Sequence, residues 1–94
     1  MKILIKEEFQ DDFTTRIAGE RLRKKILSVQ EKIILDFEGL KIASASFFDE
    51  GIAKLSEEGW NSDDVENKVH FLNLFKKDQE LLRIVCKDRG IILK

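Results

Sequence analysis

The stretch IILDFEGLKIASASFFDEGIAKL, residues 33–55, contains the transition that decides the fold. Its first residues form a continuous apolar run, which is typical of a strand covered on both faces in a parallel sheet. Further along, Phe48, Ile52 and Leu55 recur at the spacing of one helical face. We therefore expect a strand over residues 31–37 to be followed, after a short break, by an amphipathic helix.

The junction between this strand and this helix is rich in polar side chains. Ser46 stands three residues before Asp49, which is the spacing of a capping box, so we expect the helix to begin near Ser46. The Ser46 hydroxyl is either a structural cap or a phosphorylation site, where a phosphate would gain from the helix dipole and be repelled by the nearby acids. Asp49 and Glu50 are adjacent, so they point about 100° apart on a helix and do not form a paired-carboxylate catalytic site. They are either solvated acids or contacts for a partner's Arg or Lys.

Apolar periodicity divides the rest of the chain into further elements. The segments are residues 2–9 and 68–75 as strands, 60–67 as a polar loop, and 15–30 and 76–89 as helices. Asp12 or Thr15 can cap the first of these helices and Asp78 the last. Residues 91–94 form either a short strand or a docked tail. The alternation of strands and helices predicts a single α/β domain over residues 1–94, with right-handed crossovers.

Glycine positions carry information because the chain has five glycines and no proline. Gly19 and Gly51 fall inside predicted helices, where glycine costs stability unless two backbones approach closely. Gly59 follows the apolar helix of residues 46–58 and suits a left-handed cap.

Composition and charge exclude several classes of protein. The 94 residues are 43% apolar and include seven Phe, so one domain with a real core is expected. The formal net charge is −1, which gives no general attraction to nucleic acid or to an anionic membrane. No apolar run approaches the ~20 residues of a membrane-spanning helix, and the first residues lack the features of a signal peptide. The single Cys86 fits a reducing cytosol, so we expect a cytoplasmic protein.

No motif indicates a cofactor, a metal or a nucleophile. Neither of the usual glycine-rich phosphate loops occurs. His70 has no Cys or His at metal-ligand spacing, and Cys86 lies on a helical apolar stripe, where a core position is the simplest interpretation. Asp36, at the end of the central strand, either bonds the following turn or faces the same rim as the serines. We expect no enzyme activity, no cofactor and no metal.

Several segments of the chain together resemble the bacterial STAS-like family of unknown function. The matching stretches are FTTRIAGERLRKKI, IILDFEGLKIASASFFDE and VHFLNL. The features shared with the family are Phe13, Arg16, Asp36, Phe37, Gly39, Phe47, Asp49, Glu50 and Asn73. The resemblance covers nearly the whole chain.

This resemblance implies a fold like that of anti-sigma factor antagonists, with a small mixed, mostly parallel sheet of three to five strands and about three helices. In those proteins a D-S-S/T-G element opens the corresponding helix. Its Ser or Thr is phosphorylated by a histidine-kinase-type ATPase, and the phosphate releases the partner. Here the element falls on residues 44–47, where Ser44 replaces the Asp, Ala45 the usual phosphoacceptor and Phe47 the Gly, and Ser46 matches the second hydroxyl.

The resemblance therefore implies a non-enzymatic regulatory module that binds a protein, such as a histidine-kinase-type ATPase. Its contact residues are expected where the carboxyl end of the strand meets the helix. They are Ser44, Ser46, Phe48, Asp49, Glu50, Asp36 and Arg16, with Ser46 and Ser44 as the phosphorylation candidates. Two alternatives stay open: a small nucleotide-binding protein or enzyme that uses acidic residues and arginine at the sheet edge, and a homodimer that stabilises a complex.

Overall fold

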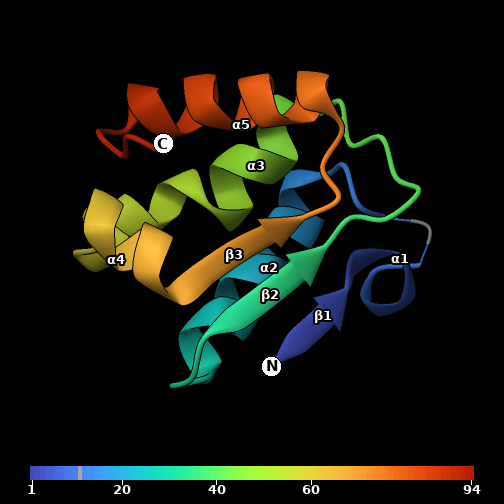
Figure 1. Cartoon of the computed structure of the whole chain (residues 1–94), viewed down its shortest axis with the longest axis horizontal. Helices are drawn as coiled ribbons and strands as arrows, with labels where there is room; N and C mark the ends of the chain where they lie inside the picture. Colours follow the sequence, from blue (N-terminus) through green and yellow to red (C-terminus); the bar gives the residue numbers. More distant parts are fainter. Residues whose placement is uncertain (11) are drawn as a thin grey trace.

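The computed structural model describes residues 1–10 and 12–94, and Figure 1 shows their arrangement. Three strands and five α-helices alternate along the chain, with one 3-10 helix, η1, between them. In chain order the elements are β1 (Lys2–Leu4), α1 (Ile5–Glu8), α2 (Arg16–Ser28), β2 (Ile33–Asp36), α3 (Ala45–Gly51), η1 (Ala53–Glu58), α4 (Ser62–Lys68), β3 (Val69–Leu72) and α5 (Lys76–Asp88). The α/β class predicted from the sequence is confirmed.

The sheet has the order β1-β2-β3, and both pairs of strands are parallel. Ile3, Leu35 and Phe71 lie side by side in the register and face the helices. In Figure 1 helix α2 lies behind the sheet, α5 runs across the top, and α3 lies between α5 and β3 in the view. Strands β2 and β3 are parallel neighbours, so their carboxyl ends lie at the same edge of the sheet. The segment that follows β2 and helix α5, which follows β3, therefore begin side by side.

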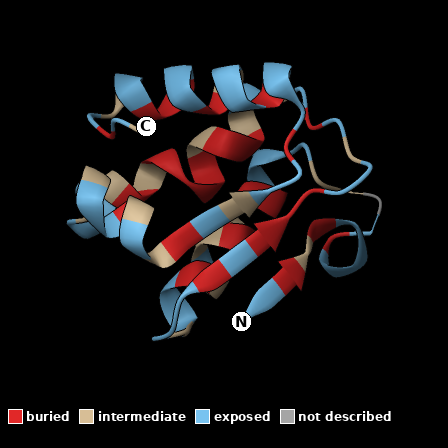
Figure 2. Ribbon diagram, in the orientation of Figure 1, coloured by how far each residue is buried: buried red, intermediate tan, exposed pale blue. Residues whose placement is uncertain are grey.

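In the part of the chain that the structure describes, helices cover one face of this sheet. The opposite face carries Lys2, Ile34 and His70 in one row, and Ile34 keeps 37% of its surface exposed. Figure 2 shows this alternation of buried and exposed residues along β2 and β3. The prediction that the central strand is covered on both faces is wrong, because Ile34 and its neighbours Lys2 and His70 are exposed on the face that no described helix covers.

Two other predicted segments differ from the structure, and for the last residues one of the two predicted alternatives is confirmed. The first strand ends at Leu4, and the charged residues after it form the short helix α1 instead of continuing the strand. The predicted polar loop of residues 60–67 is mostly helix α4, because Asn61 and Asp64 form a reciprocal capping box. The last residues are a docked tail: Ile91 is buried, and the N–H of Ile92 donates to Ser62 Oγ at 2.8 Å.

Helices α2 and α3 cross at the two glycines. A Cβ atom at Gly19 would lie 2.7 Å from Glu50 Cβ and 2.8 Å from the Phe47 carbonyl oxygen, closer than real Cβ contacts. Gly51 faces the same crossing, where an added Cβ would lie 3.0 Å from Leu22 Cδ2. The close approach predicted from these glycines is confirmed, and it places α3 firmly on α2.

Replacing Gly19 with alanine should therefore destabilise the protein. Alanine favours a helix over glycine by about 1 kcal/mol, but overpacking at a rigid crossing costs about 1–3 kcal/mol or more, so we expect a net loss of unfolding free energy. Urea unfolding of Gly19→Ala measures it. The matched variant Gly51→Ala should lose less, since its shortest contact, at 3.0 Å, is the end of the Leu22 side chain, and the nearest backbone atom is the Gly19 oxygen at 3.3 Å. Equal or greater stability of Gly19→Ala would contradict the tight crossing.

No helix in the described part of the chain combines the length and the apolar character required to cross a membrane.

Candidate functional site

A buried carboxylate holds the loop between β2 and α3 in place. Asp78 in the first turn of α5 is 4% exposed, and its two oxygens accept the N–H groups of Ile42 at 2.7 Å and Ala43 at 2.9 Å. Ala43 has a φ of +47°, in the left-handed region that residues with a Cβ rarely occupy. The two hydrogen bonds fix this conformation. The prediction that Asp78 caps its own helix is wrong, because Phe75 is the N-cap and makes no side-chain bond there.

Helix α3 begins at Ala45, and its N-cap is Ser44, two residues before the predicted cap Ser46. The Ser44 hydroxyl accepts from the Phe47 N–H at 3.2 Å and donates to the Thr14 carbonyl at 2.5 Å. The capping box expected on Ser46 is therefore wrong, since Ser44 already has the extended backbone of a cap, with φ −135°. Ser46 instead lies half-buried in the first turn of α3.

Asp49 is held by two arginines from different elements. Arg89, after α5, donates from Nε at 2.6 Å and from its second terminal nitrogen at 2.9 Å, which is a bidentate pair. Arg16, at the start of α2, donates at 3.0 Å. The bonds from Arg89, followed by those from Arg16, lower the pKa of Asp49 to about 2 against some opposing burial. Asp49 thus ties α2, α3 and α5 together.

Glu50 is the centre of a second group of ion pairs. It is 9% exposed, and its carboxylate contacts Lys54 at 2.8 Å and Arg23 and Arg16 at 3.1 Å each. Arg23 also donates to the Glu50 carbonyl. Lys54 is the main cause of a pKa of about 2 for this carboxyl. Both acids are therefore partners of cations within the chain, which differs from the expectation of solvated acids.

These ion pairs predict a loss of stability in acid. A carboxyl whose pKa is lowered on folding stabilises the protein above its unfolded pKa, near 4, and this contribution is lost as the pH falls through about 2. The unfolding free energy should therefore fall between about pH 5 and about pH 2. The double variant Asp49→Asn, Glu50→Gln should be less stable at pH 7 and show a flatter decline. The exposed control Asp63→Asn should decline as the native protein does, and a double variant with an unchanged slope would contradict the assignment.

Two other predicted contact residues are buried. Phe48 is fully buried against Phe37 and Phe47, with ring centroids 6.4 and 6.0 Å away, so it does not lie on the docking surface that was predicted. Asp36 is 3% exposed and accepts from the Glu38 N–H at 3.0 Å. The interpretation that it bonds the following turn is confirmed.

Asp36, the last residue of β2, also contacts the first residue of β1 and the residue that follows β3. Asn73, after β3, donates to it at 2.9 Å from a left-handed backbone with φ +62°. Lys2 of β1 lies 3.4 Å from its other oxygen. The bond from Asn73 is the main cause of the lowered pKa of Asp36. Asp36 and Asn73, two of the residues that carry the resemblance described above, thus link the ends of the neighbouring strands β2 and β3.

What remains on the surface is a smaller site than the sequence predicted. A groove of about 410 Å³ is lined by Arg16, Ala45, Asp49, Val85, Asp88 and Arg89. Ala45, which lines the groove, and Ala43, two residues before it in the sequence, are both exposed. The Arg16 side chain keeps 56% of its surface exposed. We define the α3 surface as Arg16, Ala43, Ala45 and Ser46. Asp49 is already paired with Arg16 and Arg89, so the α3 surface offers small side chains, a hydroxyl and part of an arginine.

Chemistry at this surface is limited by what the side chains are bound to. With pKa values of about 2, Asp49 and Glu50 stay ionised at neutral pH and make poor general acids or bases. Burial raises the pKa of Cys86 to about 12, which makes its thiol inert. Among the described residues, no cluster of three or more His, Cys, Asp or Glu side chains could hold a metal.

Sequence reasoning missed the cationic partners and the role of Asp78. Lys54 was detectable, because it follows Glu50 at the i,i+4 spacing of helical ion pairs. Arg89 lies 40 residues from Asp49, so no local pattern links them. Asp78 did leave a signal, because it interrupts the apolar stripe that continues at Leu82 and Val85.

Comparison with known proteins identifies the family. Neither a curated protein nor a solved structure matches the chain. A family model described as the STAS-like domain of unknown function, DUF4325, matches residues 18–79, which is well over half of the 94 residues and contains β2, α3, β3 and most of α2. The matched segment also contains Asp36, Asn73 and Asp78, the residues that lock the strands and the loop. The chain therefore belongs to the STAS-like domain family of unknown function.

Proposed function

We propose that this STAS-like domain is a non-enzymatic regulatory module of bacterial cytoplasm, which binds a protein partner through the α3 surface. The observation that carries the proposal is the loop before α3. Asp78 holds it in a strained conformation at the carboxyl end of the central strand, with Ala43 and Ala45 exposed. Strain that neighbouring residues maintain is typical of functional positions.

The partner that best suits this surface is a histidine-kinase-type ATPase. Support comes from the family, whose better-understood relatives in fold are read at the start of the corresponding helix. The local geometry also favours docking over catalysis, because small exposed side chains admit close contact and the nearby carboxylates are held by arginines. Arg16 is the charged group of the surface that is exposed enough to reach a partner.

Ser46 is the better of the two phosphorylation candidates. The Ser44 hydroxyl makes two hydrogen bonds that a phosphate would break, one of which caps the helix. Ser46 is the second residue of α3 and belongs to the α3 surface. A phosphate on Ser46 would leave the helix cap formed by Ser44 in place. A phosphate there adds nearly two negative charges beside Asp49, so we expect it to release the partner.

Binding can be tested with two variants that add the same charge at exposed helical positions. Ala45→Arg places a bulky cation in the α3 surface, and Asn67→Arg places one on α4, away from it. Titration of a histidine-kinase-type ATPase from the same cell into each protein measures the affinity. We expect Ala45→Arg to weaken binding about tenfold or more, as charge and bulk do at the centre of an interface, and Asn67→Arg to bind as the native chain does. Equal effects of both variants would contradict the site.

Phosphorylation needs a separate experiment. The chain is incubated with the same ATPase and ATP, and its intact mass is measured. We expect one added phosphate on the native chain and on Ser44→Ala, and none on Ser46→Ala. No added mass on any form would remove the phosphoswitch, and a nucleotide that alone raises the melting temperature of the chain would favour the nucleotide-binding alternative.

A further inference from the structure

The outer edge of β3 has no strand beside it in the part of the chain that the structure describes. The Leu72 carbonyl accepts from the Phe37 N–H at 2.9 Å, so the backbone N–H and C=O of Leu72 point toward the neighbouring strand β2. Because backbone groups of successive residues in a strand point to opposite sides, Phe71 directs both its N–H and its C=O away from β2. The Val69 N–H already donates to Val65, which leaves the Val69 carbonyl as a second outward acceptor.

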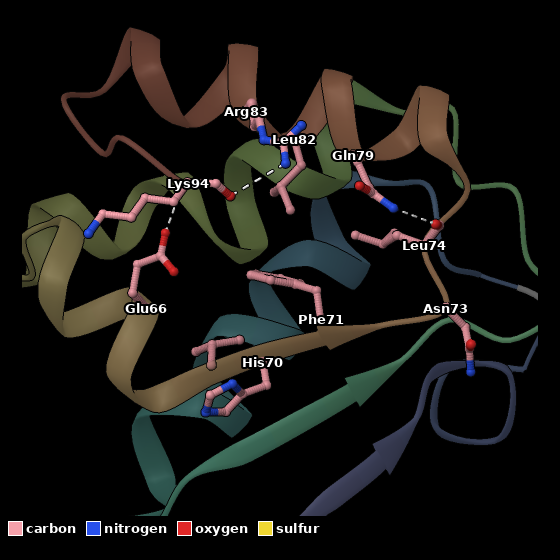
Figure 3. Close-up of a pocket in the computed structure, with 10 residues that line it drawn as sticks. Glu66, His70, Phe71, Asn73, Leu74, Gln79, Leu82, Arg83 and Lys94 are labelled. Atoms are coloured by element: carbon pink, nitrogen blue, oxygen red, sulfur yellow. Dashed lines mark hydrogen bonds between the residues drawn. The ribbon is translucent and has the colours of Figure 1, made fainter.

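This edge opens onto a groove between β3 and α5. The cavity has a volume of about 380 Å³ and lies between the strand, the turn after it and the facing side of the helix. In Figure 3 the side chains of Phe71 and Leu82 project into the space between strand and helix, with Leu74 at one end. The groove therefore offers a row of backbone hydrogen-bonding groups next to an apolar wall.

The other end of the groove carries positive charge. Arg83 and Lys94 line it together with Glu66, whose carboxylate accepts the Lys94 N–H at 2.7 Å. Arg83 makes a long hydrogen bond of 3.4 Å to the main-chain oxygen of Lys94 and no ion pair with the side chain of any residue that the structure describes. This arginine is thus available to a carboxylate of a partner.

The edge also lacks the usual protection against pairing. Soluble proteins protect exposed strand edges with lysine, proline, bulges or a covering segment. The sequence of β3 is Val-His-Phe-Leu, with neither lysine nor proline, and the docked tail of residues 91–94 reaches the Arg83 end of the groove without pairing with Phe71.

We propose that this edge binds an extended segment of a partner protein as a fourth strand. The backbone of the segment would pair with Phe71 and the Val69 carbonyl, as in other cases of strand addition. Side chains two positions apart in a strand face the same way, so an aliphatic residue would pack on Leu82 and Leu74 while an acidic residue two positions away meets Arg83. The groove shares no lining residue with the groove at the α3 surface, so this second site goes beyond the function proposed above.

The test uses the synthetic peptide Thr-Val-Thr-Asp-Thr-Val-Thr, which presents the aliphatic and acidic pair in both strand directions. Amide chemical shifts of the ¹⁵N-labelled chain are followed as this peptide is added. We expect the largest shifts at Phe71, Asn73 and Arg83, and none at the α3 surface. Shifts confined to other elements, or no shift at millimolar peptide, would overturn the proposal.

Two charge reversals on α5 give the matched comparison. Arg83→Glu lies in the groove, whereas Lys77→Glu lies on the same helix outside it. Arg83→Glu should weaken peptide binding about tenfold or more, and Lys77→Glu should change it less than about twofold. Equal effects would overturn the acidic specificity. A dimer that forms without peptide and shifts the Phe71 amide on dilution would overturn the proposal in favour of a second copy of this chain.

Discussion

Replacing Phe48 with alanine should lower the free energy of unfolding by about 3–5 kcal/mol, the usual cost of deleting a fully buried aromatic side chain. Its ring has no exposed surface and packs edge-on against Phe37 and Phe47. The cavity would lie where Phe48 packs between Phe37, which follows β2, and Phe47 of α3. Helix α3 is held there by its close crossing with α2 at the glycines. A loss of this size would be a large part of the stability of a domain of this length.

The measurement is urea unfolding of Phe48→Ala beside Phe75→Ala. Phe75 is an aromatic residue that keeps 46% of its surface exposed, so its removal should cost about 1 kcal/mol or less. The comparison decides whether Phe48 belongs to the core or to a binding surface. A Phe48→Ala variant as stable as the native chain, but defective in binding a partner, would contradict its place in the core.

Replacing Asp78 with alanine should lower the free energy of unfolding by about 3–4 kcal/mol. The variant leaves the N–H groups of Ile42 and Ala43 without their acceptors, and each bond to a charged acceptor is worth about 1.5–3 kcal/mol. Part of the loss should be recovered, because Ala43 can relax from its left-handed conformation once it is released.

Hydrogen exchange distinguishes this mechanism from general destabilisation. The amides of Ile42 and Ala43 should exchange much faster in Asp78→Ala. The exchange rates of the β2 amides should rise only by the amount that the lower free energy of global unfolding accounts for. Glu80→Ala, which removes an exposed acid from the same helix, should leave both stability and exchange close to native. Protected loop amides in Asp78→Ala would show that other contacts hold the loop.

The order of the main strands and helices could be predicted because periodicity is a local property. The apolar stripe of Ala18, Leu22 and Ile26 faces the core in α2, and Thr15 caps the helix by accepting from the Ala18 N–H, as expected. Glycine inside an apolar helical pattern is also a local signal, and it correctly indicated that two backbones approach closely. Each of these predictions rests on neighbours within one or two helical turns.

The start of α3 could not be predicted, because two cap patterns overlap in the sequence. Ser46 and Asp49 have the better capping-box spacing, but the tertiary bonds of Asp78 turn the chain at Ala43 and leave Ser44 as the residue with extended backbone. The cap is thus selected by a side chain more than 30 residues away. Such a choice leaves no trace in local spacing.

The sequence predicted where several of the candidate residues lie in the fold, but not which residues they contact. Asp49 and Glu50 do lie beside the loop that follows β2, yet their charges are neutralised by arginines from α2 and from the end of α5. Phe48 was assigned both to an apolar helical face and to the contact surface, and burial confirms only the first of these. The charged side chains at this edge of the sheet form ion pairs with residues far away in the sequence. Such long-range pairs cannot be predicted from the local pattern of one sequence.

The most direct test of the account is the footprint of a bound partner on the ¹⁵N-labelled chain. With a histidine-kinase-type ATPase as the partner, we predict that amide signals of Arg16, Ala43, Ala45 and Ser46 shift or broaden, and that Ala45→Arg abolishes these changes while Asn67→Arg does not. A footprint that leaves those four residues unchanged and falls only on the edge of β3 and on Arg83 would contradict docking at the α3 surface.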